Sequence, residues 1–475
     1  MKGHIMISKK HKKISLLLAM LLVANWAYTA DTHTINHLFE LNKHASLYTP
    51  RTVTELQQIV KQAAQEQKKI SLVGADKSQG GQTISSDKQA VRISLKNLNR
   101  LLMLDLAHKE VTVEAGMTWA ELQKHIVHHG MAIKAMQSYD DFAIGGSLSV
   151  NVHGQDILYA PLITTVKEIK IMLANGNIVT ASRTENSDLF SAAIGGYGLI
   201  GIIIEATLSL TDDVLLERHA TLIDAHELSN YFLTHVKNNP KTCFYSARFS
   251  MGSNDLLKKA LVITYEYSNQ HNQSLFALAS PTKDLWKKPL IELTSRVEII
   301  KNWRMCLESL YNNMPQTISR NNFLNYSIET LPQERADSYN ILQEYFIPYN
   351  QINAFLDYLK IVVQTYHVNL INITARHVPQ NDESMLSYSK QDVCAFVLFI
   401  NVDKNRHAYQ RVASWTNKLI DKAIACQGVY YLPYHLLGTQ EQLEKTYPRF
   451  QEFVQLKRSY DPQGLFSNAL YEKYT

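Results

Sequence analysis

The sequence has few of the residues that build metal centres and disulfide frameworks. Its 475 residues include four cysteines, which lie far apart and form no CxxC pair: Cys243, Cys306, Cys394 and Cys426. Zinc sites and disulfide-rich scaffolds need cysteines at short spacings, so scattered buried thiols are expected instead. Three histidines have helical spacing but no acidic partner, and we predict no metal site from them: His125, His128 and His129.

Strong charge of one sign is missing as well. The formal net charge is +5, and four positive charges stand in one short run, Lys9, Lys10, Lys12 and Lys13, so the rest of the chain is close to neutral. No basic stripe with interleaved aromatic residues occurs, which argues against nucleic-acid binding. Charged residues make up 19% and hydrophobic residues 45% of the chain, a balance typical of globular proteins rather than disordered ones.

The chain also lacks a long uninterrupted hydrophobic run. The apolar segment after the lysines, Ile14 to Ala24, has 11 residues, too few to span a hydrocarbon core about 30 Å thick. Trp26 and Tyr28 extend it with side chains that favour membrane interfaces. A basic run followed by an apolar segment is typical of a signal peptide or signal anchor, here over residues 1–30. Tyr28 makes cleavage after Ala30 unfavourable, so both alternatives stay open, and we expect an exported, periplasmic or membrane-anchored protein.

A regular pattern of helices and strands starts near Ser46. Residues 52–67 predict a helix, because Thr52 and Glu55 have the spacing of a capping pair and apolar residues follow on one stripe: Leu56, Ile59, Val60 and Ala63. A second capped helix is predicted from Thr118 to Gly130. Strands are predicted at residues 70–74, 90–98, 110–116 and 200–210.

The pattern changes from about Asp212 onward. Aromatic-rich strands are predicted at 242–250, 260–267 and 394–402, and they alternate with long helices at 353–366 and 406–424. The less regular segment 269–335 is expected to form a lid or insertion. The last fifty residues have the character of a closing segment with one helix around residues 440–457.

Two glycine-containing loops carry most of the chemical signal. The first glycine loop is VGADKSQGGQT (residues 73–83), and the second is AIGGSLSVNVHG (residues 143–154). Glycine lets successive backbone N–H groups approach a diphosphate, because it has no Cβ and accepts positive φ. One such loop is as easily a structural turn. Two of them in one α+β unit favour a shared, large, anionic ligand.

A third glycine loop, AIGGYGLIG (residues 193–201), contains a formal GxGxxG at Gly196, Gly198 and Gly201. In a dinucleotide-binding turn this pattern follows a strand and opens a helix. Here the helical DLFSAAI precedes it, and the β-branched strand IGIIIEATLSL follows it. We therefore predict that this loop is not a Rossmann NAD site.

Together these pieces resemble the FAD-binding domain of the vanillyl-alcohol oxidase family, also called the PCMH-type domain. The resemblance rests on the order TPRTVTELQQIV, first glycine loop, VTVEAGMTWAELQ, IGGSLSVNVHG and GGYGLIG, and the tail YDPQGLFSN is similar to the family's closing motif. It implies an α+β fold with three parts: a PCMH-type FAD-binding domain at 41–213, an α+β substrate or cap domain with an antiparallel sheet at 214–425, and a C-terminal segment at 426–475 that packs back on the FAD domain.

The resemblance also implies which residues contact FAD. They are Gly74, Ala75, Asp76, Lys77, Ser78, Gln79, Gly80, Gly81, Gln82, Gly145, Gly146, Ser147, Ser149, Asn151, His153, Gly154, Gly198, Gly201, Ile202 and Asn468. Many members tether the flavin through a histidine before the loop serine. Here Lys77 precedes Ser78, and Asp76 stands where glycine is common, so FAD is expected to be bound noncovalently.

The second half is most similar to the branch with aldonolactone oxidases, alditol oxidases and decaprenylphosphoryl-ribose oxidase, through LQEYFIP, NITARHVP, YYLPYHLLGT and YPRFQEFVQLKRSYDP. Arg376, beside His377 at the end of a predicted strand, is the candidate that binds an anionic or polyhydroxylated substrate, with a surface salt bridge as the alternative. Tyr434 and His435 fall about where decaprenylphosphoryl-ribose oxidase carries its catalytic lysine and the next residue. A tyrosine there donates a hydrogen bond to a substrate hydroxyl but supplies no cation.

Lys457 completes the catalytic candidates, while Gln343 and Tyr345 are weaker ones. Tyrosine is abundant, with 25 residues in 475, so a single tyrosine more often serves packing than catalysis.

We therefore predict an FAD-dependent oxidoreductase that oxidises a CH–OH group of a sugar, alditol or aldonolactone. The hydride goes to flavin N5 while a protein group accepts the hydroxyl proton. Two electron acceptors stay open: oxygen, as in an oxidase, or a quinone or protein carrier, as in a dehydrogenase. A non-catalytic flavin-binding protein is the third alternative, because Tyr434 stands in place of lysine.

Overall fold

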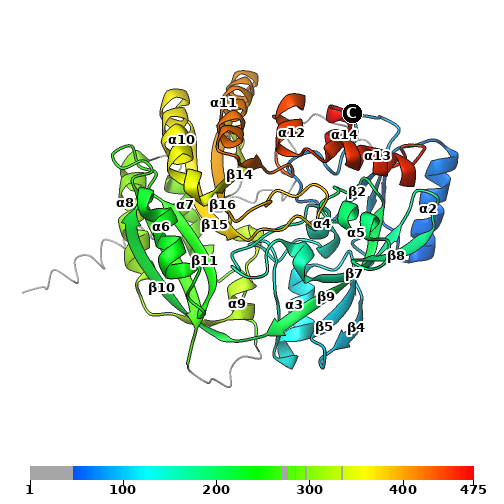
Figure 1. Cartoon of the computed structure of the whole chain (residues 1–475), viewed down its shortest axis with the longest axis horizontal. Coiled ribbons are helices and arrows are strands. Elements are labelled where there is room, and N and C mark those ends of the chain that lie inside the picture. The colour runs from blue at the N-terminus through cyan, green and yellow to red at the C-terminus, as the bar shows by residue number, and fades with distance from the viewer. Residues whose placement is uncertain (1–45, 270–276, 284, 295–296, 333–334) are drawn as a thin grey trace, which may run out of the picture. The chain divides into compact units, whose positions relative to one another are not determined.

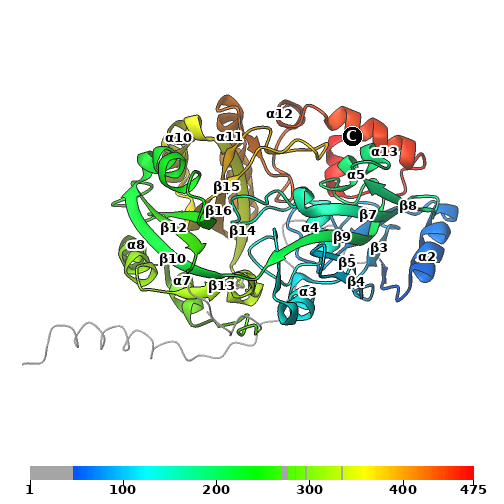
Figure 2. The ribbon, with the colours of Figure 1, turned by 60° about the horizontal axis from the view of Figure 1, so that its bottom comes forward.

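The computed structural model describes residues 46–269, 277–283, 285–294, 297–332 and 335–475, which belong to one compact unit (Figures 1 and 2). The signal or anchor predicted at residues 1–30 lies outside the described residues. In the described ranges, no helix has the length and apolar character needed to cross a membrane. None of the four cysteines forms a disulfide; three are buried, and Cys306 is exposed, contrary to the prediction of buried thiols throughout.

Among the described residues, the N-terminal half contains two small sheets and four α-helices. A parallel three-stranded sheet has the order β1 (Leu47–Tyr48), β3 (Val91–Ser94), β2 (Ile70–Val73). An antiparallel sheet has the order β4 (Leu101–Asp105), β5 (Glu110–Glu114), β9 (Ile202–Asp212), β7 (Val166–Met172), β8 (Ile178–Ser182), and β6 (Met131–Ile133) pairs with the end of β9. The helices are α2 (Val53–Gln65), α3 (Trp119–Ile126), α4 (Ile144–Ser149) and α5 (Ser187–Ala193).

Local capping explains why the two predicted helices form. At α2 the Thr52 hydroxyl accepts from Glu55 N, while the Glu55 carboxylate accepts from Arg51 N rather than from Thr52 N. At α3 the Thr118 and Glu121 pair is a complete capping box, which satisfies two amides that would otherwise lack partners. A 3₁₀ turn, Val127–His129, continues α3 and ends at Gly130 with φ 67°, as predicted.

The C-terminal half is built on an eight-stranded antiparallel sheet. Its order is β13 (Thr317–Ser319), β10 (Leu215–Asp224), β12 (Lys259–Tyr267), β11 (Thr242–Phe249), β15 (Asn369–Val378), β16 (Val393–Asp403), β14 (Ser338–Pro348), β17 (Val429–Tyr430). Helices α10 (Ile352–Tyr366) and α11 (Arg406–Ala425) lie side by side against β14 and β16 (Figure 1). The short helix α6 is Leu228–Tyr231.

Three predictions about local structure need correction. The irregular segment 269–335 contains helices: α7 (Lys288–Thr294), α8 (Glu298–Asn312) and α9 (Arg320–Leu324). The helix predicted at 440–457 is two helices, α12 (Gln440–Thr446) and α13 (Phe450–Tyr460), because a residue that precedes proline, here Tyr447 before Pro448, disfavours the helical conformation. The second glycine loop is not wholly a loop, since α4 lies inside it.

The side chains of strand β14 point alternately to the two faces of the large sheet. Tyr345 packs on Phe355 of α10, with ring centroids 5.4 Å apart, and Gln343 Nε2 donates to Thr416 of α11 at 2.7 Å. The neighbouring Glu344 points the other way and contacts His153 of the second glycine loop. Successive side chains of a strand alternate between faces, so the side of the sheet opposite α10 and α11 meets the glycine loops.

Buried polar contacts join the two halves and the C-terminal segment. Arg320 of α9 donates to Asp156, just after the second glycine loop, at 2.6 Å, and both side chains are buried. Ile70 of β2 donates to the carbonyl of Leu465 at 2.7 Å, and Ser467 N donates back to the carbonyl of Ile70 at 2.9 Å. The last helix, α14 (Ala469–Tyr474), follows directly.

Candidate active site

The first and second glycine loops meet each other. A Cβ placed on Gly74 would lie 3.6 Å from Cα of Gly146. Gly146 is exposed, and a Cβ there would meet no protein atom within 4 Å. In the part of the chain that the structure describes, no hydrogen bond uses a backbone N–H of residues 74–82 as donor. The loops therefore present unengaged backbone N–H groups beside an open space, which is the arrangement that a diphosphate requires.

Two residues of the first glycine loop have positive φ values, and only one of them is a glycine. Asp76 has φ 54° and Gly81 has φ 77°. Glycine adopts such values without strain, whereas an aspartate pays for them. The Asp76 carboxylate accepts from Arg92 at 3.2 Å, an interaction that a glycine could not make. Ala75 and Lys77, the other predicted contacts of this stretch, are half-buried.

The first glycine loop also touches the rest of the site. Gln79 Oε1 accepts from Leu342 N of β14 at 3.0 Å, and Gln82 Nε2 donates to the carbonyl of Leu432 at 3.0 Å. Ser78 donates to Gln82 Oε1 at 2.5 Å. A Cβ on Gly80 would lie 2.3 Å from the carbonyl oxygen of Tyr434. Glycine is required at position 80 because the backbone around Tyr434 packs directly on it.

The polar side chains of the second glycine loop hold the loop itself. Ser147 Oγ accepts from Trp119 Nε1 at 2.9 Å, and Ser149 Oγ donates to the carbonyl of Gly145 at 2.7 Å. Asn151, with φ 47°, accepts from Ile163 N at 3.0 Å. The structure thus engages these three side chains locally, and the exposed backbone at Gly146 is the part of the loop that is open to a ligand.

The third glycine loop lies between α5 and β9, as predicted, so its GxGxxG has no Rossmann context. Tyr197 N donates to the carbonyl of Ser149 at 2.8 Å, and Asn468 Nδ2 donates to the carbonyl of Tyr197 at 2.9 Å. Gly198 and Gly201 pack on β2 and β7, and Ile202 opens β9 in the core. This loop joins the second glycine loop to the C-terminal tail.

A buried polar chain crosses from the second glycine loop to the large sheet. His153 Nε2 lies 2.6 Å from Glu344 Oε1, and Tyr434 OH donates to Glu344 Oε2 at 3.2 Å. Burial, and then the Glu344 carboxylate, raises the pKa of Tyr434 well above its usual value. Tyr434 therefore stays a protonated phenol at neutral pH.

Aromatic rings enclose the imidazole of His153. The ring centroids of Phe346, Tyr388 and Tyr431 lie 5.4, 5.9 and 6.1 Å from that of His153. A Cβ on the next residue, Gly154, would lie 2.2 Å from the carbonyl oxygen of Met136. Close packing keeps water away from the His153 and Glu344 pair, and a hydrogen bond between such groups gains strength in a surrounding of low polarity.

Arg376 lies on the same face of the large sheet as Glu344. Thr374 and Glu344 both pair with Val397 of β16, and Arg376 is two residues beyond Thr374, which returns it to that face. Its Nη2 donates to Ser138 Oγ at 2.8 Å, and its buried Nε has no partner within the described residues. A guanidinium with a spare donor on this face is suited to an oxygen-rich or anionic ligand.

The remaining candidates lie elsewhere. Lys457 is fully buried and paired with Asp461 at 2.7 Å inside the C-terminal segment, so the structure does not bring it to Glu344. Gln343 and Tyr345 face the helices. His377 contacts the Tyr349 hydroxyl at 3.1 Å on that helical face. His435 follows Tyr434 and is buried, and burial lowers its pKa to about 4, so it is neutral at neutral pH.

Glu344 is the functional candidate that sequence reasoning missed. The signal was available, since Glu344 is the one acidic residue within the strand SYNILQEYFIP, and a buried carboxylate needs a specific partner. That partner, His153, is 191 residues away in the sequence, and nothing local indicates which face of the strand it approaches.

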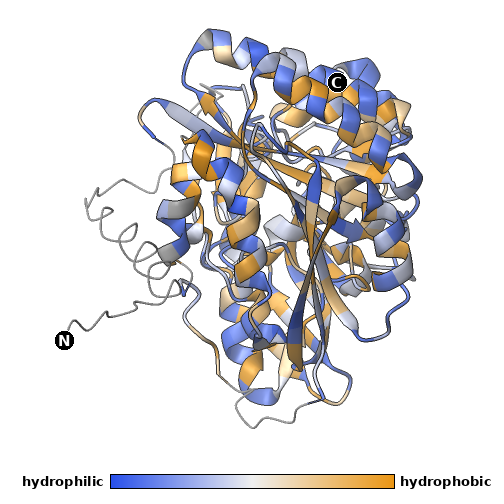
Figure 3. Ribbon diagram, turned by 90° about the vertical axis from the view of Figure 1, so that its left-hand side faces the viewer, coloured by the Kyte–Doolittle hydropathy of each residue, from blue (hydrophilic) through white to orange (hydrophobic). Residues whose placement is uncertain are grey.

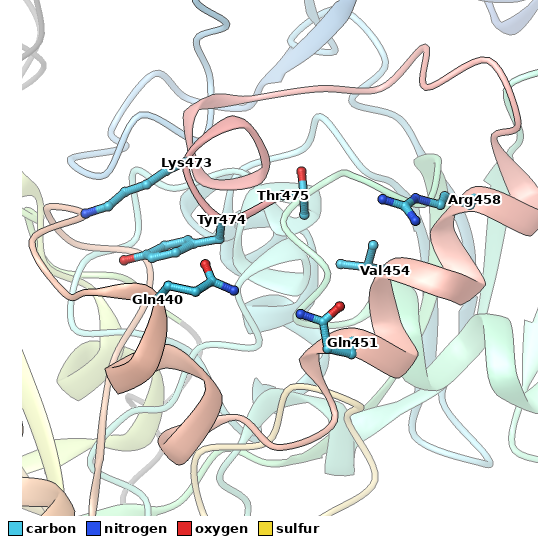
Figure 4. Close-up of a pocket in the computed structure, with 7 residues that line it drawn as sticks. All are labelled: Gln440, Gln451, Val454, Arg458, Lys473, Tyr474 and Thr475. Carbon is cyan, nitrogen blue, oxygen red and sulfur yellow. The ribbon is translucent and has the colours of Figure 1, made fainter.

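One cavity of the described residues is separate from this cluster. It measures about 390 Å³ and lies among α12, α13 and α14 (Figure 4), lined by Gln440, Gln451, Val454, Arg458, Lys473, Tyr474 and Thr475. None of these is a predicted site residue, so we place the candidate site at Glu344 and Arg376 rather than here.

Comparisons with known proteins find matches for both halves of the chain. A family described as FAD binding domain matches residues 45–182, and one described as D-arabinono-1,4-lactone oxidase matches residues 261–474. L-Gulonolactone oxidase of Bos taurus is 23% identical over 444 residues, which covers 90% of this chain and 94% of that protein. D-Arabinono-1,4-lactone oxidase of Yarrowia lipolytica is 34% identical over 170 residues, which covers 34% of this chain and 31% of that protein.

Fold, glycine loops and comparisons together define an FAD-dependent oxidoreductase of the PCMH type. Within that family the chain is similar to the aldonolactone oxidase branch. The predicted fold class, the FAD cofactor and the oxidation of a CH–OH group are confirmed, and the non-catalytic alternative is not favoured. The domain boundaries and the roles of the single site residues stay predictions.

Proposed function

We propose that this protein oxidises the hydroxyl carbon of an aldonolactone and passes the electrons to oxygen. The relatives that cover most of the chain carry the name L-gulonolactone oxidase, and the family that matches its second half is described as D-arabinono-1,4-lactone oxidase. The observation that carries the proposal is the polar cluster of Arg376, Tyr434, Glu344 and His153, on one face of the large sheet beside the glycine loops.

The residues of the glycine loops fit FAD. The unengaged N–H groups of residues 74–82 and the open side of Gly146 would hold its diphosphate. Bound there, FAD supplies the acceptor for the hydride. Lys77 stands at the position where many other members carry the histidine that bonds to the flavin. The Nε2 atom of His153 is already engaged by Glu344. We therefore infer noncovalent binding.

Arg376 binds and orients the substrate. A lactone carries a carbonyl oxygen and several hydroxyl oxygens, all of which accept hydrogen bonds. The spare Nε donor of Arg376 is buried, and an unsatisfied buried donor gains more from a ligand oxygen than an exposed one does. Ser138 fixes the orientation of the guanidinium through Nη2.

Glu344 is the final acceptor of the hydroxyl proton. Tyr434 donates to one carboxylate oxygen and His153 contacts the other. A substrate hydroxyl that donates to the Tyr434 oxygen loses its proton to that oxygen while Tyr434 passes its own proton to Glu344. The contact with His153 keeps the carboxylate in place. Tyr434 acts in this relay as a neutral phenol, so a tyrosine can serve at this position although it supplies no cation.

The proposal is tested with purified protein in three steps. The protein is expected to be yellow, and acid precipitation is expected to release the colour into the supernatant; a yellow pellet would show a covalent bond. Under anaerobic conditions, L-gulono-, L-galactono- or D-arabinono-1,4-lactone should bleach the flavin, while alditols should not. Air should restore the colour. Bleaching by alditols but not by lactones would contradict a lactone as the substrate. Slow recovery of the colour in air together with fast recovery after addition of a quinone would contradict oxygen as the electron acceptor.

We also infer that residues 1–30 direct the protein to a membrane or through it. The support is the sequence of a basic run followed by an apolar segment. Fractionation of cells, combined with the N-terminal sequence of the mature protein, distinguishes a cleaved signal from a retained anchor. Recovery of the full chain only in the cytoplasmic fraction would overturn this inference.

A further inference from the structure

Helix α8 turns two of its charged residues, Arg304 and Glu308, toward the large sheet. Arg304 is buried, and its Nη1 donates to the carbonyl of Ile371 on β15 at 2.5 Å. Arg304 also contacts Glu308 at 2.7 Å, and Glu308 contacts Arg248 of β11 at 3.5 Å. The side of α8 that faces the large sheet therefore carries an ion-pair network, where a surface helix normally places its apolar stripe.

The outward side of α8 is apolar. At about 100° per residue, five residues fall within an arc of roughly 100°: Ile299, Trp303, Cys306, Leu307 and Leu310. All five are exposed, with 70% of Ile299, 63% of Trp303 and 62% of Leu310 accessible. No charged residue lies within the arc. We call these five residues the outer stripe.

Exposed apolar residues in the chain segments just before and after α8 add to the outer stripe, and we call the whole set the patch. Leu293 of α7 and Leu285 before it are exposed, as is Met314 just after α8. Figure 3 views the molecule from the side on which α8 lies in Figure 1 and shows apolar ribbon on the helices there. Single exposed apolar residues are common on proteins, but a contiguous patch marks an interaction surface.

The surroundings of the patch indicate what covers it. Apart from the inward pair of Arg304 and Glu308, residues 277–316 carry five basic and three acidic residues, and Lys287 and Lys288 follow Leu285 closely in the sequence. A tryptophan and leucines on one side of a helix, with basic residues beside them, are the features of a helix that lies in the plane of a membrane surface. The basic and apolar segment at residues 1–30 independently favours a membrane. A stripe one helix wide is narrow for a stable dimer, which buries about 800 Å² on each partner.

We propose that the outer stripe of α8 lies in the headgroup region of a bilayer that contains anionic lipids. The helix rests parallel to the membrane, with Trp303 and Leu310 among the acyl chains and the neighbouring lysines at the lipid phosphates. The inward ion pairs keep α8 attached to the large sheet during this contact.

Cys306 allows a direct test on the full chain. It lies in the outer stripe and is the exposed cysteine, whereas Cys243, Cys394 and Cys426 are buried. Burial raises the pKa of Cys243 to about 11, which slows its reaction with thiol reagents. A polarity-sensitive fluorophore on Cys306 therefore reports contact of this face with lipid, and it does so separately from any binding by residues 1–30.

Vesicles of phosphatidylcholine and phosphatidylglycerol are expected to shift the emission to the blue, and quencher-labelled lipids are expected to reduce it. Phosphatidylcholine alone should bind more weakly. Ile299→Glu should raise the lipid concentration needed for half of the response at least about tenfold, because a charge replaces an apolar group that contacts lipid in the bound state. The matched control is Ile361→Glu on α10, where the isoleucine is 57% exposed and Asp357 lies one turn earlier; it should leave the response unchanged.

An emission that vesicles do not change, with full flavin content, would overturn the proposal. A blue shift without vesicles that grows with protein concentration would show that a second copy covers the stripe, which also overturns it. Equal effects of Ile299→Glu and Ile361→Glu would show that the response is general surface charge rather than docking of α8.

Discussion

The substitution Glu344→Gln tests the assignment of the proton acceptor directly. Glutamine keeps the size and shape of glutamate but removes the negative charge and most of the basicity. Glu344 lies 2.6 Å from His153 Nε2 and accepts from Tyr434 at 3.2 Å. The amide retains one acceptor oxygen, so one of the two contacts survives, while neither the phenol nor the substrate can pass a proton to it.

The expected loss is large in rate and moderate in stability. A positioned base contributes roughly 10²–10⁴-fold to a proton transfer, so kcat should fall at least about 100-fold. Replacing one charge-assisted hydrogen bond in a buried site costs about 1–3 kcal/mol, which a chain of this size tolerates. FAD content should be unchanged, because Glu344 makes no contact with residues 74–82 or Gly146 among the described hydrogen bonds.

The assay is single-turnover bleaching of the bound flavin by lactone, followed in a stopped-flow instrument and normalised to FAD content. The matched control is Gln343→Leu on the same strand. Gln343 is also buried, but it faces α11 and donates to Thr416, so its loss should lower the free energy of unfolding by about 1–2 kcal/mol and leave the bleaching rate unchanged. A Glu344→Gln variant with more than a third of the wild-type rate would refute the reasoning, as would equal rate losses in both variants.

Three further substitutions test other parts of the site. Gly146→Val should leave the stability of the FAD-free protein unchanged, because a Cβ there meets no protein atom within 4 Å, but it should lower FAD per chain, measured by absorbance at the flavin band; full occupancy would show that the diphosphate lies elsewhere. Lys457→Met should lower the free energy of unfolding in urea by about 3–5 kcal/mol, because it leaves the buried Asp461 unpaired, while kcat per bound FAD stays at the wild-type value, and a loss of kcat would restore Lys457 as a catalytic residue. Burial, and then Asp141, raises the pKa of Asp140 from 3.8 to about 6. The folded protein therefore binds this proton more tightly than the unfolded chain, and its stability should fall by about 2–3 kcal/mol as the pH rises from about 4 through 6. Asp140→Asn should remove this loss, which melting temperatures between pH 4 and 8 measure.

Elements that depend on neighbours in sequence could be predicted from the sequence. The helices α2 and α3 begin at Thr52 and Thr118, where each cap and its partner are three residues apart. Helix α4 could not be predicted, since Gly145 and Gly146 disfavour a helix. Its first turn forms because Ile144 N donates to Met117 and Gly145 N donates to Ala115, and those partners are distant in the chain.

The site was predictable to the level of loops and not of side chains. Composition indicated that residues 143–154 bind a ligand, but the hydroxyls of Ser147 and Ser149 are engaged within the loop, and only the tertiary structure shows that. Glu344 illustrates the reverse case, because its role depends on which face of β14 it occupies. Sequence periodicity gives the two faces of a strand or helix, while the fold decides which of them is inward. Helix α8 shows the consequence, because its charged side, with Arg304, is the buried one.

The first glycine loop is completed by residues from the far end of the chain. Ala469 N donates to the carbonyl of Ile84 at 2.8 Å and to that of Gly81 at 3.3 Å, and Asn468 holds the third glycine loop through Tyr197. The buried pair of Lys457 and Asp461 fixes this tail, since the Asp461 carboxylate also accepts from Leu465 N and Phe466 N. Lys457 therefore holds the C-terminal tail, whose backbone contacts the first glycine loop. The formal GxGxxG has a similar place, because its glycines lie where the tail, the second glycine loop and β2 pack together.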